Sequence, residues 1–262
     1  MNNKKLLSII IYVKNNFDLI KNCLRSINFK KRNEVEVIVI DGNSNDGTKE
    51  VISKYEPLID IFLSEDDHSA SDAMNKGVKL ASGDFITFLS SDDEYISKNL
   101  DKSLEFIKLY KNYDLINFNT IIEFENKNQK LFLRASEKSF SEIIERPFTN
   151  SRFYKRVKFI KLGCFKIEYD AADLLFLLEA FYKNIRVINC DLTFYKYKSH
   201  KNSKTLSFDK NSILTLKLNL IKIFNYLLMS KFSVKLKSII IYFYLRSIIK
   251  ILILKLNLLF KS

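Results

Sequence analysis

The first third of the chain alternates between short, almost continuously apolar runs and longer stretches with helical spacing. The runs Val35–Ile40 and Phe85–Leu89 place apolar side chains on both faces of a strand. A strand of this kind must be buried on both faces, as happens in a parallel sheet covered by helices on either side. The pattern therefore predicts an α/β fold built on a doubly wound, mostly parallel sheet of the Rossmann-like type.

The same pattern gives the expected elements. The expected strands are 6–13, 35–41, 60–64, 85–89, 115–124 and 130–133, and the expected helices are 18–29, 48–54, 72–81, 99–113 and 173–182. A chain of 262 residues is long enough to bury one large core and carry an appendage. Its three cysteines are far apart, so we expect neither a disulfide framework nor a thiolate zinc site.

The positive charge of the chain is concentrated at its C-terminal end. Residues 201–262 contain eleven lysines and one arginine against the single acid Asp209, a net charge of +11. The whole chain carries +13, so residues 1–200 carry about +2. A nucleic-acid-binding protein would carry its basic patch on the main domain, which this distribution does not favour.

The basic segment is also strongly apolar, but it contains no uncharged run of the length that spans a bilayer. On a helix, Lys235, Arg246, Lys250 and Lys261 fall on one stripe beside an apolar remainder. We therefore expect a main domain over residues 1–200 and a basic amphipathic helical tail over residues 201–262. The tail would lie on an anionic membrane surface, which places the protein in the cytoplasm at the inner face of the membrane. The alternatives are a tail packed on the domain, a tail forming a homodimer contact, and a spanning helix with snorkelling lysines.

Polar and acidic residues follow each of the first four expected strands. They are Lys14–Asn16, Asp41–Thr48, Glu65–His68 and Ser90–Glu94. In open α/β sheets, ligands bind beyond the carboxyl ends of the strands, so these segments should share one site. Carboxylates gathered in this way repel one another unless a cation or a ligand neutralises them, which predicts a divalent metal ion.

Four of these segments carry a resemblance to a known family. Ser8–Asn16, Ile40–Thr48, Asp72–Gly77 and Ala81–Asp93 resemble, in this order, motifs of bacterial family 2 glycosyltransferases, which have the GT-A fold. A weaker likeness continues through Gly163–Phe165 and Ala171–Leu175, so that it covers about 175 residues. The resemblance implies a nucleotide-sugar half over residues 1–100 and an acceptor half over residues 101–200.

The resemblance also implies roles for the acidic residues near the diphosphate. Asp93 would bind Mg²⁺ or Mn²⁺ directly, and Asp92 would lie near the ribose or in the outer shell of the metal ion. A hard divalent ion of this kind stabilises the negative charge that develops on a leaving diphosphate. Asp72 and Asn75, in the third motif, would belong to the nucleotide-sugar site.

The nucleotide base would be held by the first two motifs. By resemblance, Asp41 accepts a hydrogen bond from the N–H of the base, while Tyr12 and Lys14 flank it. Asp41 could instead cap the turn at Gly42. Asp46 and Thr48 are suited to capping the following helix.

An inverting transfer needs a general base that faces the acceptor hydroxyl. Asp173 matches the late acidic position of the family and is the expected base, with Asp170 and Glu168 as rivals. Asp173 could also serve only as a helix N-cap.

The chain departs from the family pattern at several positions. Ser69–Ser71 and Met74 replace residues that are common in relatives near the diphosphate, and Thr149-Asn150 stands where close relatives often carry His-Gln. His68 and His200 form no ligand pair, and surface positions are expected for both. These departures keep open a non-catalytic GT-A module that binds a sugar nucleotide or scaffolds a membrane assembly.

The expected activity is a hexosyltransferase-type reaction. An inverting enzyme would move a sugar from a nucleotide-sugar donor, most simply a UDP-sugar, to a hydroxyl of a lipid-linked saccharide in surface polysaccharide synthesis, such as O-antigen or capsule. A nicotinamide dehydrogenase is excluded, because Tyr12–Asn16 lacks the glycine-rich turn that lets a pyrophosphate approach the backbone.

Overall fold

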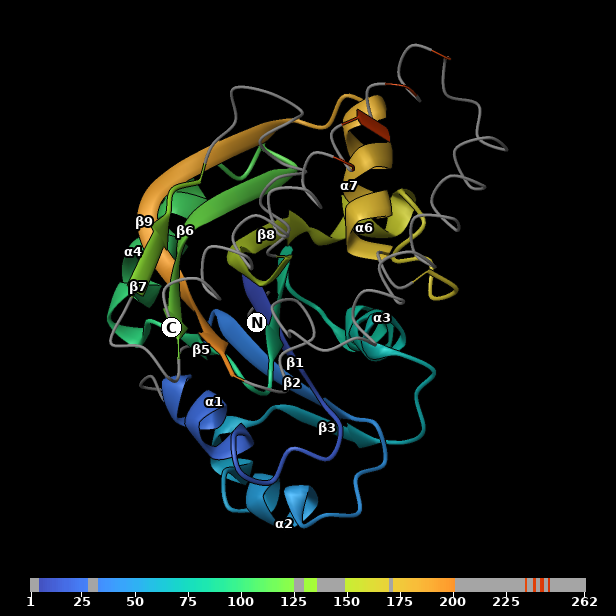
Figure 1. Ribbon diagram of the computed structural model, residues 1–262. Helices are drawn as coiled ribbons and strands as arrows, with labels where there is room; N and C mark the ends of the chain where they lie inside the picture. The colour runs from blue at the N-terminus through green and yellow to red at the C-terminus, as the bar shows by residue number, and fades with distance from the viewer. Residues whose placement is uncertain are drawn as a thin grey trace, which may run out of the picture.

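The structure is a computed structural model, shown in Figure 1. It describes residues 5–27, 33–124, 130–135, 149–169 and 172–200, together with five helical positions near the C-terminus: Val234, Ser238, Ile241, Tyr242 and Leu245. Among these residues, no helix is both long and apolar enough to cross a membrane. The expected basic tail lies almost wholly outside the described residues, and so does Asp170.

The described residues form one nine-stranded sheet. Its strands are β1 (Leu7–Val13), β2 (Val35–Asp41), β3 (Ile61–Ser64), β4 (Phe85–Ser90), β5 (Glu94–Tyr95), β6 (Leu115–Phe124), β7 (Lys130–Leu133), β8 (Arg152–Lys155) and β9 (Val187–Ser199). They are ordered β3-β2-β1-β4-β8-β6-β9-β5, with β7 paired to β6. The first four neighbours in this order are parallel, whereas β8 is antiparallel to both β4 and β6, and β9 runs parallel to β6.

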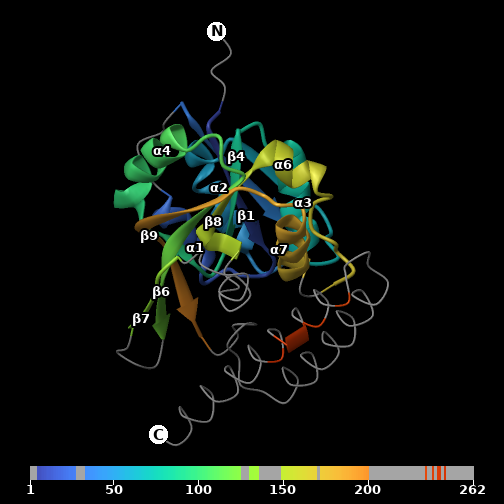
Figure 2. The ribbon, with the colours of Figure 1, turned by 90° about the horizontal axis from the view of Figure 1, so that it is seen from above.

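Helices cover both faces of the sheet. They are α1 (Ile20–Ser26), α2 (Thr48–Ser53), α3 (Ala70–Leu80), α4 (Leu100–Leu109), α6 (Arg156–Lys161) and α7 (Ala172–Tyr182). One core cluster joins the sheet to α1, α2 and α4, and a second joins it to α3, α6 and α7. Figure 2 shows α4 and α7 on opposite sides of the strands. The predicted α/β architecture with a doubly covered sheet is confirmed.

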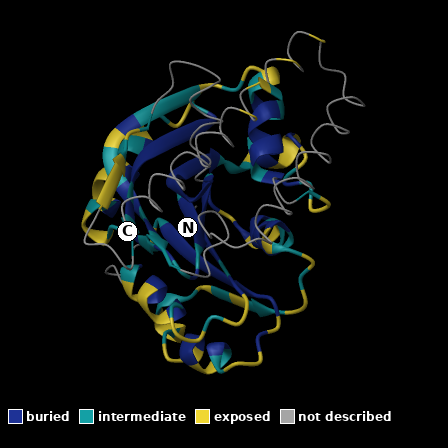
Figure 3. Ribbon diagram, in the orientation of Figure 1, coloured by how far each residue is buried: buried dark blue, intermediate teal, exposed yellow. Residues whose placement is uncertain are grey.

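The sequence of β1 shows how one strand supplies both clusters. Leu7, Ile9 and Ile11 pack with the first cluster, while Ile10 between them packs with the second. This follows from the alternation of side chains along a strand. All of these side chains are fully buried, as the dark central strands in Figure 3 illustrate.

The strands predicted in the first half agree with the structure to within one residue, but three later elements were not predicted. These are β8, α6 and the long strand β9. The short strand β8 has a charged residue at each end, Arg152 and Lys155, and β9 carries Lys196 and Lys198, so the sequence predicts neither as a buried strand. Their positions depend on pairing with β4 and β6, which are distant in sequence.

Candidate active site

The site is built where the parallel strands β1, β2 and β4 end side by side. Tyr12 of β1 is in register with Ile40 of β2 and with Ser90 of β4, and the next residue, Val13, is in register with Asp41. The segment Ser91–Glu94 leaves β4 at this same edge. The convergence predicted for these polar segments is therefore present in the fold.

Asp93 is buried at this edge, with 2% of its surface exposed. One carboxylate oxygen accepts a hydrogen bond from the hydroxyl of Tyr195, and the other accepts one from the backbone N–H of Lys198 at 2.9 Å. Burial and the neighbouring charge of Asp92 raise the pKa of Asp93 to about 8, against the lowering effect of its hydrogen bonds. A positive charge beside this carboxylate would favour its ionised form.

The end of β9 provides partners for the whole acidic segment. His200 Nε2 lies 3.1 Å from Asp92 Oδ2, and Lys196 and Lys198 both pair with Glu94. His200 was expected at the surface, but only 16% of its side chain is exposed because β9 brings it against Asp92. His68, in contrast, is exposed as expected.

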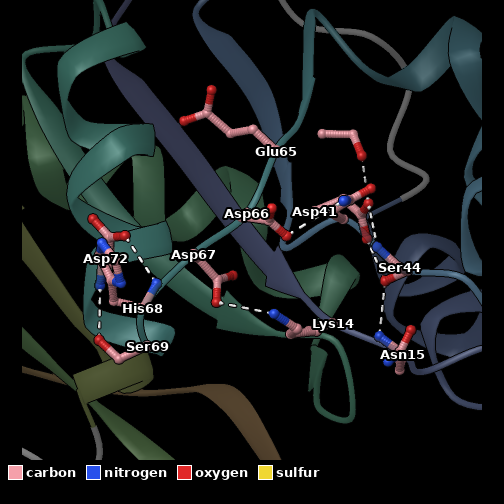
Figure 4. A network of polar contacts seen from close by, with 12 residues as sticks. Lys14, Asn15, Asp41, Ser44, Glu65, Asp66, Asp67, His68, Ser69 and Asp72 are labelled. Atoms are coloured by element: carbon pink, nitrogen blue, oxygen red, sulfur yellow. Dashed lines mark hydrogen bonds and ion pairs between the residues drawn. The ribbon is translucent and has the colours of Figure 1, made fainter.

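Asp41 is fully buried at the end of β2, and its carboxylate has partners within the chain. It accepts hydrogen bonds from the N–H of Ser44 at 3.0 Å, the Ser44 hydroxyl at 2.5 Å and the Ser64 hydroxyl at 2.7 Å. Figure 4 shows Asp41 and Ser44 near Lys14 and Asn15. The bond to the Ser44 N–H corresponds to the turn-capping alternative for Asp41.

Lys14 and Asp67 approach one another next to Gly42, and Figure 4 shows the ion pair. Lys14 Nζ is 3.8 Å from Asp67 Oδ1, and 8% of the Asp67 side chain is exposed. Burial raises the pKa of Asp67, while the charge of Lys14 acts in the opposite direction. A Cβ atom at Gly42 would lie 2.2 Å from Asp67 Oδ2, so only glycine allows this approach. In the sequence, Asp67 is one of several acids after β3, and no motif distinguishes it from them.

Asp72 lies in the first turn of α3 and helps to begin that helix. Its backbone N–H is bonded to the hydroxyl of the N-cap residue Ser69 at 3.2 Å, and its carboxylate accepts the N–H of His68 at 3.1 Å. Lys76 lies 3.7 Å from the same carboxylate. These contacts resemble a capping box and give Asp72 a structural role at the start of the helix.

Asn75 fastens α3 to the segment that follows α6. Its side-chain N–H donates to the carbonyl of Phe165 at 2.8 Å, and its oxygen accepts the N–H of Phe165 at 3.1 Å. Gly163 and Cys164, just before Phe165, both have positive φ. Both the nitrogen and the oxygen of the Asn75 side-chain amide thus hold this tight turn.

Asp173 lies in the first turn of α7 and is partly buried. Its Oδ1 accepts the N–H of Leu174 at 2.8 Å, and its Oδ2 accepts the hydroxyl of Thr149 at 2.7 Å. The rival acid Glu168 is exposed. Thr149 begins η3 (Thr149–Ser151), the turn that leads into β8.

A divalent metal ion was predicted at Asp93. Within the described ranges, no three His, Cys, Asp or Glu side chains are grouped to hold a metal ion. Mg²⁺, however, is often bound by one or two carboxylates, with water and substrate phosphates completing its shell. The buried Asp93 next to Asp92 fits that mode of binding, because an added cation would offset the burial and repulsion that raise its pKa.

Similar solved structures share this fold. The S. aureus TarS fragment 1-349 in complex with UDP-GlcNAc superimposes with a TM-score of 0.67 at 20% identity, over 92% of this chain and 72% of that chain. The mannosyltransferase PcManGT from Pyrobaculum calidifontis, in complex with GDP-Man and Mn²⁺, gives a TM-score of 0.62 at 13% identity, over 90% of this chain and 68% of that one.

The sequence model described as Glycosyl transferase family 2 matches residues 8–167, which is more than half of the chain. The chain belongs to glycosyl transferase family 2. The predicted GT-A fold agrees with this membership and with the structural neighbours. The match contains the candidate residues from Tyr12 to Asp93 and ends before Asp173, Tyr195 and His200.

Curated relatives carry names that refer to the synthesis of several glycans. The GalNAc(5)-diNAcBac-PP-undecaprenol beta-1,3-glucosyltransferase of Campylobacter jejuni is 32% identical over 151 residues, 56% of this chain and 48% of that protein. The putative teichuronic acid biosynthesis glycosyltransferase TuaG of Bacillus subtilis is 33% identical over 107 residues, 40% of this chain and 42% of that protein. The chain therefore spans about half the length of these relatives.

Proposed function

We propose that this family 2 protein is an inverting glycosyltransferase that moves a sugar from a nucleotide-sugar donor, of the UDP type, to a hydroxyl of a lipid-linked saccharide. The observation that carries the proposal is the buried Asp93, placed beside Asp92 where β1, β2 and β4 end. Burying a carboxylate next to another carboxylate costs stability, and such pairs are found mainly at functional sites. The donor class is supported by the TarS complex with UDP-GlcNAc.

Different residues at the strand ends would bind different parts of the nucleotide-sugar donor. Asp93 would hold Mg²⁺ or Mn²⁺, which supplies positive charge to the leaving diphosphate, and Asp92 would lie near the ribose or in the outer shell. Tyr12, Lys14 and Asp41 would surround the base. The Asp41 carboxylate already has donors in Ser44 and Ser64, so its contact with a base would be an additional hydrogen bond.

Asp173 would act on the acceptor side. The acceptor oxygen attacks the anomeric carbon, the bond from that carbon to the diphosphate oxygen breaks, and the proton of the acceptor hydroxyl passes to the Asp173 carboxylate. The nucleoside diphosphate leaves with its electron pair. One displacement of this kind inverts the anomeric configuration.

The acceptor and the location are proposed from the relatives and from the charge distribution. A lipid-linked acceptor is supported by the undecaprenol-linked substrate in the name of the C. jejuni relative, and surface glycan synthesis by the name of TuaG. Residues 201–262, with their net charge of +11, would hold the protein on the anionic inner face of the membrane. Flotation of the full chain with anionic but not neutral vesicles, reversed by salt, is the expected result. Equal flotation with both would contradict electrostatic attachment.

Turnover with a panel of nucleotide sugars tests the activity. The full chain should consume one or more donors in the presence of Mn²⁺ or Mg²⁺, and Asp93→Asn should abolish this consumption. Asp101→Asn, on the exposed side of α4, is the matched control and should retain activity. Binding of a sugar nucleotide without turnover would favour the alternative, a non-catalytic module. Full activity of Asp93→Asn would contradict the assignment of the site.

A further inference from the structure

The turn η3 connects the two sides of the candidate active site through adjacent residues. Thr149 is bonded to Asp173 on the acceptor side, and Asn150 donates to the hydroxyl of Tyr195 at 3.2 Å. Tyr195 in turn donates to Asp93. The hydrogen bonds that reach Asp173, the candidate base, and Asp93, the candidate metal ligand, therefore start from two adjacent residues of the chain.

This turn is well held by the core. Thr149, Asn150 and Ser151 are all buried, at 7%, 8% and 7% exposure. The hydroxyl of Tyr95 shares its one proton between the carbonyl of Phe88 in β4, at 2.7 Å, and the carbonyl of Asn150, at 3.2 Å. A buried turn with satisfied hydrogen bonds has little freedom to move, so the Thr149 hydroxyl is a fixed point.

Asp173 depends on that fixed point for the orientation of its carboxylate. One of its oxygens is bonded to the N–H of the adjacent Leu174, which fixes that end to α7. The other is bonded to the hydroxyl of Thr149, which lies outside the helix. Without the hydroxyl, the carboxylate could rotate about its side-chain bonds while its helix stayed in place.

We propose that Thr149 is a positioning residue for transfer: its hydroxyl holds the carboxylate of Asp173 at a set place relative to Asp93. This inference rests on the proposed function, because it assumes that Asp173 accepts the proton. The Thr149 hydroxyl donates to the acid from outside the helix of that acid. A base displaced by about 1 Å loses on the order of 100-fold in rate, while donor binding on the other side is unaffected.

The test compares Thr149→Val, which keeps the shape and removes the hydroxyl, with Thr149→Ser, which keeps the hydroxyl. For the donor that the parent chain consumes, Thr149→Val should lower kcat by about 10- to 100-fold and leave the KM for the donor within about twofold. Thr149→Ser should stay within about threefold of the parent. Ser103→Ala removes a buried hydroxyl on α4 and is the control for loss of stability alone, so its kcat should be unchanged.

The outcomes separate this inference from the function on which it rests. A normal kcat in Thr149→Val, or equal losses in the Val and Ser variants, would overturn the positioning role while leaving the transferase in place. Unchanged activity of Asp173→Asn would also overturn it, because no base would then need positioning. Absence of turnover by the parent chain with every donor would refute the proposed function itself.

Discussion

Glu36 provides a test of how the sheet is held at the end opposite the candidate site. Its carboxylate is 4% exposed and accepts four hydrogen bonds. The donors are the Ser8 hydroxyl at 2.5 Å, the Ser82 N–H at 2.6 Å, the Ser82 hydroxyl at 2.9 Å and the Gly83 N–H at 3.0 Å. Glu36 thus joins β1, β2 and the turn before β4.

The magnitude follows from the number and kind of these bonds. A hydrogen bond to a charged group contributes about 1.5–3 kcal/mol and a neutral one about 0.5–1.5 kcal/mol. Glu36→Gln keeps one oxygen for the three donors on Oε1 but makes these bonds neutral, so we expect a loss of about 2–3 kcal/mol in the free energy of unfolding. Glu36→Ala leaves the N–H groups of Ser82 and Gly83 without this acceptor and should lose about 4–5 kcal/mol.

Urea and thermal unfolding measure both losses. The loss in Glu36→Gln corresponds to a fall in Tm of about 4–12 °C, at roughly 2–4 °C for each kcal/mol in a domain of this size. Glu34→Gln is the control, because Glu34 forms an exposed pair with Lys108 and should lose less than about 1 kcal/mol. The kcat of folded Glu36→Gln should equal that of the parent. Stability within about 0.5 kcal/mol of the parent for Glu36→Gln and Glu36→Ala alike would refute the reasoning.

Three further results are expected. The pKa of Asp93, about 8 in the folded metal-free protein, is above its unfolded value, so the contribution of Asp93 to stability is present at low pH and lost as pH rises towards 8. From pH 5 to pH 8, the free energy of unfolding of the parent should therefore fall relative to that of Asp93→Asn. A difference between the two proteins that does not depend on pH would contradict the raised pKa. Asn75→Ala removes both hydrogen bonds to Phe165 and should lower the free energy of unfolding by about 1–3 kcal/mol, with little change in the Kd of a nucleotide. A large loss of nucleotide binding at unchanged stability would instead place Asn75 in the donor site. Gly77→Ala puts a Cβ 2.3 Å from a methyl group of Ile10, so it should destabilise the protein by about 1–2 kcal/mol in urea unfolding despite the better helix propensity of alanine. Adding Ile10→Ala to the same chain should remove this extra cost. A stabilised Gly77→Ala variant would show that the packing around Ile10 relaxes.

The first half of the fold could be predicted because its signals are local. Strand and helix periodicity depends on residues that are close in sequence, and the apolar runs of β1, β2 and β4 are buried on both faces. The rule that parallel strands present their carboxyl ends at one edge then brings Tyr12, Asp41 and the Asp92-Asp93 pair together. For the site, the sequence therefore predicted which residues meet at this edge.

The sequence could not show the partners of these residues, because those partners come from distant segments. Tyr195 and His200 reach Asp93 and Asp92 from β9, more than 100 residues later in the chain. Local composition near His200 indicated a domain boundary, whereas the pairing of β9 with β6 places it beside the acidic pair. In the same way, Asp72 and Asn75 match a family motif, but only the fold shows their contacts with His68 and Phe165.

By itself, the sequence determined the α/β architecture, membership of the family through its ordered motifs, and the edge of the sheet at which chemistry should be sought. The tertiary structure decided how each acid at that edge is held: Asp93 by β9, Asp41 by Ser44 and Ser64, and Asp173 by Thr149. The physical reason is that periodicity and turn preferences act over a few residues, while the burial and hydrogen bonding of a carboxylate depend on which segments the folded sheet brings into contact with it.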